Sequence, residues 1–194
     1  MKKIILWGDG LLAGPQGFAD LLIQHIFLHH PKADVSTSIY GGANETWLEI
    51  SRDVPLHVIG KAPDLVVFGF GICDILAGKS PKEVVDQALV SIQMALHKTQ
   101  AKVCLLSLMS SFVENGPMRE ATETLNQLFL AMHSDRIAFI DLENRVQRFL
   151  VQHRESPGEK HALHLDSQRL TPLGRLLLAH HAFHMIEWPQ FDAA

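Results

Sequence analysis

The chain lacks the features that mark several classes of protein. It has only two cysteines, Cys73 and Cys104, so we expect reduced thiols and no disulfide framework. Lys and Arg total 17 against 21 Asp and Glu, and this net charge of −4 lacks the basic surface of most nucleic-acid-binding proteins. No uncharged apolar run approaches the roughly 18 residues of a membrane span. The apolar run at residues 4–7 is too short for a signal-peptide core, so we expect a cytoplasmic protein.

What the sequence does contain is enough apolar material for a core. Apolar residues make up 47% of the 194 residues and charged residues 20%, a composition that argues against intrinsic disorder. This length suits one domain better than two. Internal repeats, low-complexity segments and linkers are not evident. We therefore expect a single domain over residues 1–194.

Short β-branched runs alternate with longer stretches of helical periodicity. Strands are predicted at residues 4–7, 35–40, 65–69, 102–109 and 137–142. Helices are predicted at residues 18–30, 45–59 with an interruption at Pro55, 81–99, 117–132 and 173–186. Ser80, Pro81 and Glu83 form a strong helix start, whereas residues 154–165 are polar and irregular. The alternation predicts a three-layer α/β/α fold, with a flavodoxin-like sheet of five parallel strands.

The loop after the first strand is rich in glycine but does not fit a nucleotide site. It lacks the Gly-Lys-Ser/Thr ending of a phosphate-binding loop. Gly8 and Gly10 are followed by Ala13, which a loose dinucleotide fingerprint tolerates, but no acidic residue ends the second strand to hold a ribose. We therefore expect no nucleotide and no other cofactor.

Four short blocks lie where ligands bind on such sheets, near the carboxyl ends of the strands. They are Trp7-Gly8-Asp9-Gly10-Leu11-Leu12-Ala13-Gly14, Gly41-Gly42-Ala43-Asn44-Glu45-Thr46, Phe70-Gly71-Ile72-Cys73-Asp74 and Leu165-Asp166-Ser167-Gln168-Arg169-Leu170-Thr171-Pro172-Leu173-Gly174. In this order they resemble the Gly-Asp-Ser-Leu, Gly-x-x-Gly-Asp/Glu-Thr, Gly-x-Asn-Asp and Asp-x-x-His-Leu-Thr-Pro-x-Gly motifs of the SGNH hydrolases, the GDSL-type esterase and lipase group. The resemblance covers nearly the whole chain and implies the fold of that family.

The same resemblance implies that the catalytic residues are gone. In the family, a Ser attacks the acyl carbonyl, a His activates it, an Asp orients the His, and a Gly N–H and an Asn help form the oxyanion hole. Here the Ser position is Gly10, the His position Arg169 and the Asn position Cys73. The oxyanion Gly aligns with Asn44, unless a gap of one or two residues places Gly42 there. Of the five positions, only the Asp is retained, as Asp166.

The side chains at these positions determine whether the family's reaction can still occur. Gly10 has no side chain to acylate, and Arg169 stays protonated and has no acceptor, so it cannot act as a general base. The resemblance therefore implies a pseudoenzyme that binds a small ligand or a partner protein through the relic pocket. The candidate ligand-binding residues are Asp9, Gly10, Asn44, Cys73, Asp74 and Arg169.

One alternative keeps catalysis with a substituted mechanism. Cys73 would act as the nucleophile of an acyl hydrolase or acyltransferase, with His161 or His164 as its base. The simpler interpretation is that Cys73 fills the space of the missing Asn. Other hydroxyl groups follow the fourth strand, and we interpret them as turn and helix-cap residues: Ser107, Ser110 and Ser111.

The charges around the relic pocket favour some ligands over others. Asp9, Asp74 and Asp166 stand against a single base, Arg169, which we expect to pair with Asp166 first and Asp9 second. We also expect Asp9 and Asp74 to hydrogen-bond their own loops. This balance favours a neutral or cationic ligand over an anion.

Twelve histidines invite a metal interpretation. His180 and His184 have the i, i+4 spacing of a helical zinc pair, but the next residue is His181 rather than Glu, and no third ligand is evident. A helix C-terminus, where histidine interacts well with the helix dipole, explains them without a metal. We expect no metal site.

Apolar surface is the remaining hint of a partner. Trp47, Trp188 and Phe191 are candidates for an exposed patch, although Trp188 could equally pack the final helix down. The sequence leaves a homodimer open without indicating one.

Overall fold

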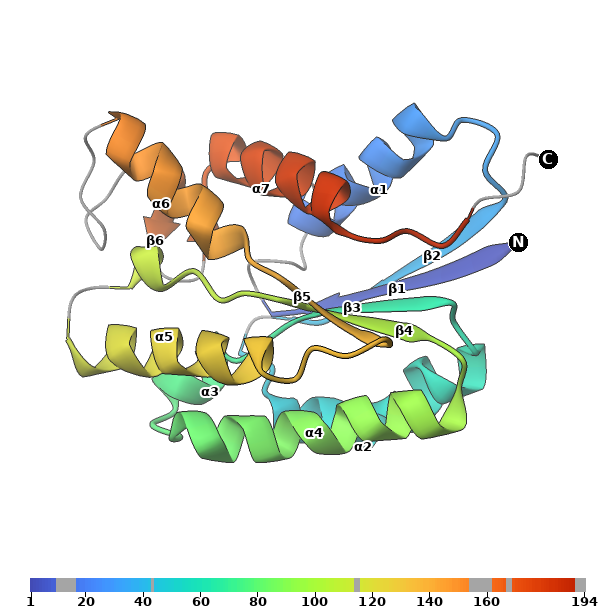
Figure 1. Cartoon of the computed structure of the whole chain (residues 1–194), viewed down its shortest axis with the longest axis horizontal. Coiled ribbons are helices and arrows are strands. Elements are labelled where there is room, and N and C mark those ends of the chain that lie inside the picture. The colour runs from blue at the N-terminus through green and yellow to red at the C-terminus, as the bar shows by residue number, and fades with distance from the viewer. Residues whose placement is uncertain (10–16, 43, 114–115, 154–161, 167–168, 191–194) are drawn as a thin grey trace.

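The computed structural model of this chain describes residues 1–9, 17–42, 44–113, 116–153, 162–166 and 169–190. A single sheet lies between two layers of helices (Figure 1). One face is covered by α1 (Phe18–His29), α6 (Leu142–His153) and α7 (Pro172–Met185). The other face is covered by α2 (Trp47–His57), α3 (Ile72–Leu76), α4 (Pro81–Lys98) and α5 (Pro117–Leu130). Two 3₁₀ turns, η1 (Ile59–Lys61) and η2 (Ser110–Phe112), complete the helical elements described.

The central sheet has the predicted five parallel strands. They are β1 (Lys2–Gly8), β2 (Val35–Tyr40), β3 (Leu65–Gly69), β4 (Lys102–Leu106) and β5 (Ile137–Ile140). Their order is β2-β1-β3-β4-β5, and every neighbouring pair is parallel. The chain order reverses at β1, so the loops after β1 and β3 open toward the same edge, as the α/β rule for ligand sites expects.

Alternation along the strands divides the core in two. In β1, Ile4 and Leu6 face the cluster under α1, α6 and α7, whereas Ile5 and Trp7 face the cluster over α2 to α5. All four side chains are buried. Burial on both faces explains why these strands read as continuous apolar runs. Each fully buried aliphatic side chain contributes about 1.5–3 kcal/mol to folding.

The fourth and fifth strands end earlier than predicted because side chains replace their backbone partners. β4 stops at Leu106, and the amide of Asn126 then donates to the Leu108 carbonyl and accepts from the Leu108 N–H, both at 2.8 Å. β5 stops at Ile140 because Asp141 accepts from the Asn144 N–H at 3.1 Å and so caps α6.

The predicted interruption of the second helix at Pro55 was wrong. α2 continues through Pro55 to His57, and the Val58 N–H still reaches the Val54 carbonyl at 2.9 Å. A proline removes one helical hydrogen bond. Here Ile50 and Val54 are fully buried and hold the helix on the core.

Four of the helices and strands were not predicted. α3 is a single short helix after β3, and β6 (His164–Asp166) pairs antiparallel with β7 (Arg169–Leu170). The fourth is α6, which buries Leu142, Val146 and Leu150, while most of its other positions are polar. None of the helices in the described ranges is both long enough and apolar enough to cross a membrane.

Backbone contact between two loops fixes the edge where the blocks meet. Gly41, directly after β2, has φ +121°, and a Cβ placed there would lie 1.7 Å from the carbonyl oxygen of Gly8. Only glycine allows both this conformation and this approach. The loops after β1 and β2 are therefore held together by main-chain packing.

We predict that Gly41→Ala destabilises the protein by roughly 2–4 kcal/mol, because the new methyl group clashes with Gly8 and the left-handed backbone is strained. Gly42→Ala is the matched control, since no atom lies within 4 Å of its Cβ position. Urea unfolding followed by circular dichroism measures both. Equal midpoints for the two variants would contradict the proposed contact.

Candidate functional site

A small cavity lies at the carboxyl edge of the sheet, where one residue of the first block, Asp9, and one of the fourth block, Leu170, meet. It measures about 40 Å³ and is lined by Asp9 after β1, Gly69 at the end of β3 and Leu170 of β7. Phe18 of α1 and Leu178 of α7 close it from the helical layer. Most of its other lining is apolar, from β4 and the segment that follows it. Gly10, the residue after Asp9, lies outside the described residues.

Cys73 brings the second block to the same edge. It lies in the first turn of α3 and is only 7% exposed. A backbone hydrogen bond from Asn44 reaches the thiol, and the carboxylates of Asp9 and Asp74 lie close enough to act on it. Burial first, and then these negative charges, raise the pKa of Cys73 to about 12. The thiol is therefore almost entirely protonated at neutral pH.

Asn44 itself contributes main chain rather than side chain. Its φ is 70°, a left-handed conformation that asparagine tolerates better than most residues, and its side chain is exposed. The backbone of Asn44 is hydrogen-bonded to Cys73. In the alignment with the SGNH motifs, this residue stands at the position of the glycine whose N–H helps form the oxyanion hole.

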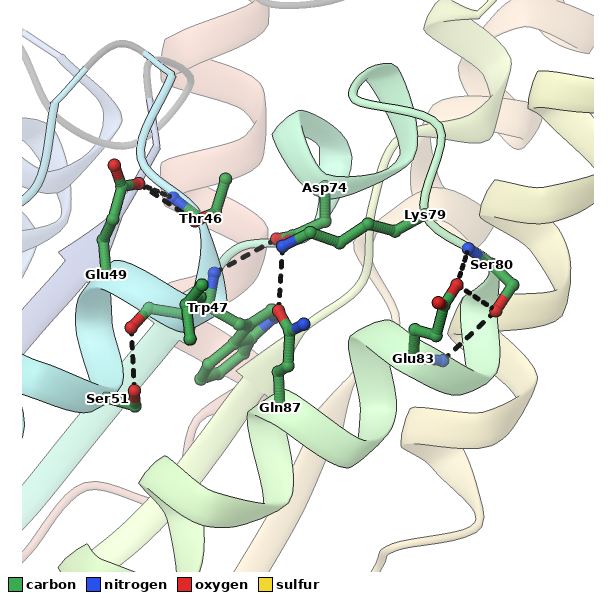
Figure 2. Close-up of polar contacts among 10 residues, drawn as sticks. Thr46, Trp47, Glu49, Ser51, Asp74, Lys79, Ser80, Glu83 and Gln87 are labelled. Atoms are coloured by element: carbon green, nitrogen blue, oxygen red, sulfur yellow. Dashed lines mark hydrogen bonds and ion pairs between the residues drawn. The ribbon is translucent and has the colours of Figure 1, made fainter.

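Asp74 has a structural role that sequence reasoning missed (Figure 2). It is fully buried, and its two oxygens accept from the Trp47 N–H at 3.2 Å and from Lys79 Nζ at 2.6 Å. Lys79 also donates to Gln87 Oε1 at 2.8 Å. Besides Lys79, which follows α3 in the chain, Asp74 thus also bonds Trp47 at the start of α2, a contact between distant segments that the sequence did not suggest. Lys79 neutralises Asp74, so the acids expected at the pocket reduce to Asp9 and Asp166.

The fourth block forms the β6–β7 hairpin in front of α7. Asp166 and Arg169 are register partners in this hairpin, and the pairing of their side chains stays a prediction. Thr171 caps α7 by accepting from the Gly174 N–H at 3.0 Å. A Cβ at Gly174 would lie 1.9 Å from the Leu163 carbonyl oxygen, so the hairpin rests directly on the helix. His161, one of the two candidate bases for Cys73, lies outside the described residues, and the side chain of the other, His164, is not described.

The serines after β4 surround the buried carboxyl group of Glu143, and their partner is thus not a histidine that could act as a base. Ser110 donates to Glu143 Oε1 at 3.0 Å, and the hydroxyl and N–H of Ser111 donate to the same oxygen. Ser107 Oγ accepts from the Glu143 N–H at 2.9 Å and so caps α6, as the cap interpretation expected. Burial raises the pKa of Glu143. Glu143 was missed because the segment around it showed too weak an apolar pattern.

The histidine and tryptophan hypotheses have separate outcomes. Among the described residues, no group of three or more His, Cys, Asp or Glu side chains is placed to hold a metal ion. Trp47 is fully buried, so the predicted surface patch was wrong. Trp188 instead packs against the end of α7, where its indole N–H donates to the Phe183 carbonyl at 2.7 Å. Phe191 lies outside the described residues.

A larger hollow lies elsewhere. It measures about 750 Å³ and is lined by residues at the amino ends of β3 and β4, such as Asp64 and Lys102, and by the chain around Trp188. None of the four blocks lines it. We assign the functional site to the smaller cavity because Asp9 and Leu170, from the first and fourth blocks, line it.

Comparison with known proteins gives the same fold. No protein-family model and no curated protein matches the chain. The acetylxylan esterase Axe2 from Geobacillus stearothermophilus superposes with a TM-score of 0.77 at 16% identity, over 100% of this chain and 97% of that one. A lipolytic protein of the G-D-S-L family from Veillonella parvula gives 0.73 at 17% identity, over 95% and 97%. The acetyl xylan esterase AlAXEase gives 0.78 at 17% identity, over 94% and 98%.

We predict that Lys79→Met costs about 3 kcal/mol of stability, because it leaves the buried Asp74 carboxylate without a counter-charge. Lys82→Met, an exposed lysine three residues along the chain, is the control and should change stability by less than about 0.5 kcal/mol. Urea unfolding at neutral pH compares the two. A Lys79→Met midpoint equal to that of the control would show that the ion pair does not hold this edge.

Proposed function

We propose that this chain, which has the SGNH hydrolase fold, is a catalytically inactive member of that superfamily that binds a small ligand at the carboxyl edge of its sheet. Gly10 offers no nucleophile and Arg169 no base. The fold and the cavity remain, so binding is the function that the residues support best.

The observation that carries the proposal is the environment of Cys73. It has the only nucleophilic side chain among the five relic positions, and it is buried next to Asp9 and Asp74. With its pKa at about 12, roughly one thiol in 10⁵ is ionised at pH 7. A catalytic cysteine needs a lowered pKa and a nearby base, so this environment argues against the acyl hydrolase or acyltransferase alternative.

The cavity limits what the ligand can be. Its volume of about 40 Å³ is far below the roughly 150 Å³ of a protein cavity that binds benzene. It therefore admits a methyl or acetyl group, and an aromatic ring is too large. Asp9, buried at its wall, disfavours an anion. Acetylxylan esterases share the fold, so we propose a neutral ligand that carries a short acyl group, such as an acetylated sugar.

Hydrolysis of p-nitrophenyl acetate tests the loss of catalysis. We expect the unmodified protein to show no rate above buffer, before or after thiol alkylation, because Gly10 supplies no nucleophile, Arg169 supplies no base and burial keeps the Cys73 thiol protonated. Activity that Cys73→Ala abolishes would establish the cysteine alternative. Activity that survives Cys73→Ala would overturn both interpretations.

The same assay tests the assignment of the relic positions. Gly10→Ser alone and Arg169→His alone should stay inactive, because each lacks the other half of the Ser–His pair. The double variant should gain esterase activity with Asp166 as the third member. Adding Cys73→Asn should raise that rate by about 10²-fold if the amide reaches the oxyanion. Asn44→Gly may be added to allow closer backbone approach. A folded triple variant without activity would show that the block alignment is wrong.

Methyl NMR tests binding directly. Acetylated xylo-oligosaccharide should shift the methyl signals of Leu106 and Leu170, whereas the deacetylated oligosaccharide and free acetate should not. Leu170→Phe should fill the cavity and abolish the shifts, and Leu173→Phe, at an exposed position outside the cavity, is the control. Equal shifts with the deacetylated sugar would exclude the acyl-group hypothesis. No shift with any probe would exclude this ligand class.

A further inference from the structure

Half of the histidines in the chain gather on two helices that pack against each other. α1 and its C-cap contribute three, and α7 contributes three: His25, His29, His30, His180, His181 and His184. The two helices lie side by side on one face of the sheet (Figure 1). Sequence reasoning considered His180 and His184 alone, because the partners on α1 are about 150 positions away.

Four of these side chains form a closed ring of contacts. The imidazole centroids of His25 and His180 are 5.5 Å apart, and those of His29 and His184 are 5.9 Å apart across the helix pair. Along each helix, His25 and His29 are 6.0 Å apart and His180 and His184 are 4.7 Å apart. The Phe183 ring stacks on His25 and His29. Protonating any of the four therefore places positive charge within about 6 Å of two others.

Among the described residues, the charged groups that act on His25 and His181 are positive. The charges that act on His25 are those of His180, His29 and His184, all cationic when protonated. α6, which packs on the other side of α7, presents Arg145 to His181, again a positive charge. The carboxylates that follow the two helices pair elsewhere, since Asp34 bonds the Met1 amino group at 2.8 Å and Glu187 bonds Lys102 at 3.0 Å.

The same helix pair closes the candidate ligand cavity. Phe18 in the first turn of α1 and Leu178 in the middle of α7 line it together with Asp9. Any loosening of α1 from α7 therefore opens the cavity wall.

We propose that the ring of His25, His29, His180 and His184 is an acid-sensitive latch that joins α1 to α7 at neutral pH and loosens them when it protonates. Its effect on a ligand rests on the proposed function, but the latch itself does not.

The direction of the pH effect follows from His25. Burial and its histidine neighbours lower the pKa of His25 below its ordinary value of 6.5. The folded state therefore binds fewer protons than the unfolded state in this range. Stability that depends on neutral His25 is present above about pH 6.5 and is lost as the pH falls through its lowered pKa.

Hydrogen exchange tests the latch locally. Protection factors of α1 and α7 amides are compared with those of α4, which lies on the opposite face, at pH 7.5 and 5.5 in EDTA. In the unmodified protein, the α1 and α7 protection should fall at least about threefold more than that of α4, because positive charges within about 6 Å of one another repel across the helix pair. His25→Gln/His180→Gln should remove this excess. His97→Gln/His133→Gln, two exposed histidines elsewhere, should keep it.

The outcomes separate the latch from the proposed function. His29→Gln/His184→Gln, which changes only exposed members of the ring, should also reduce the excess and keeps the test valid if the first double variant fails to fold. An equal loss of protection in α1, α7 and α4, or an excess that both ring variants retain, would overturn the latch. Failure to bind acetylated xylo-oligosaccharide would contradict the proposed function and leave this exchange result intact.

Discussion

A buried carboxylate holds the candidate site together. Asp74 is fully buried, and it joins the start of α2 to Lys79 beyond α3. Desolvating the two charges costs several kcal/mol for each ion, so the arrangement persists only because the geometry is good and the remaining donors are used. Because Asp74 fixes the first turn of α2, it also fixes the loop that brings the Asn44 backbone to Cys73.

Main-chain contacts provide the second constraint on this edge. Gly41 lies against the Gly8 carbonyl, and Gly174 lies against the Leu163 carbonyl. The first contact holds the loop after β2 against the end of β1, next to the lining residue Asp9, and the second holds the chain before β6 against α7, which contributes the lining residue Leu178. Neither contact leaves room for a side chain. The edge of the sheet is thus shaped by backbone packing and one ion pair. The residues at the relic catalytic positions contribute little to this framework, since Asn44 is exposed and Cys73 only fills space.

Local patterns predicted most of the fold, because local physics determines them. The five strands follow from apolar runs buried on both faces, and the starts of α4 and α7 follow from Ser80 and Thr171, which accept from the Glu83 and Gly174 N–H groups as predicted. α6 was missed because its apolar positions are few and surrounded by charge. The pairing of Asp74 with Lys79 was missed because a turn lies between the two residues. Whether the two side chains meet depends on the conformation of that turn, which the sequence pattern does not specify.

The candidate site was harder to predict because its properties arise between distant segments. The sequence identifies Cys73 as the only nucleophile at the relic positions, but the raised pKa that argues against its use comes from burial and from Asp9, more than 60 residues away. The histidines of α1 and α7 likewise contact one another only because the two helices pack together in the fold. A fold of this kind can lose a catalytic Ser and His at no cost to its core, since those side chains stand at the edge of the sheet. The cavity is instead lined by buried side chains of the core, such as Phe18, Leu106 and Leu178, so its shape depends on the packing of the fold and not on the residues at the aligned catalytic positions.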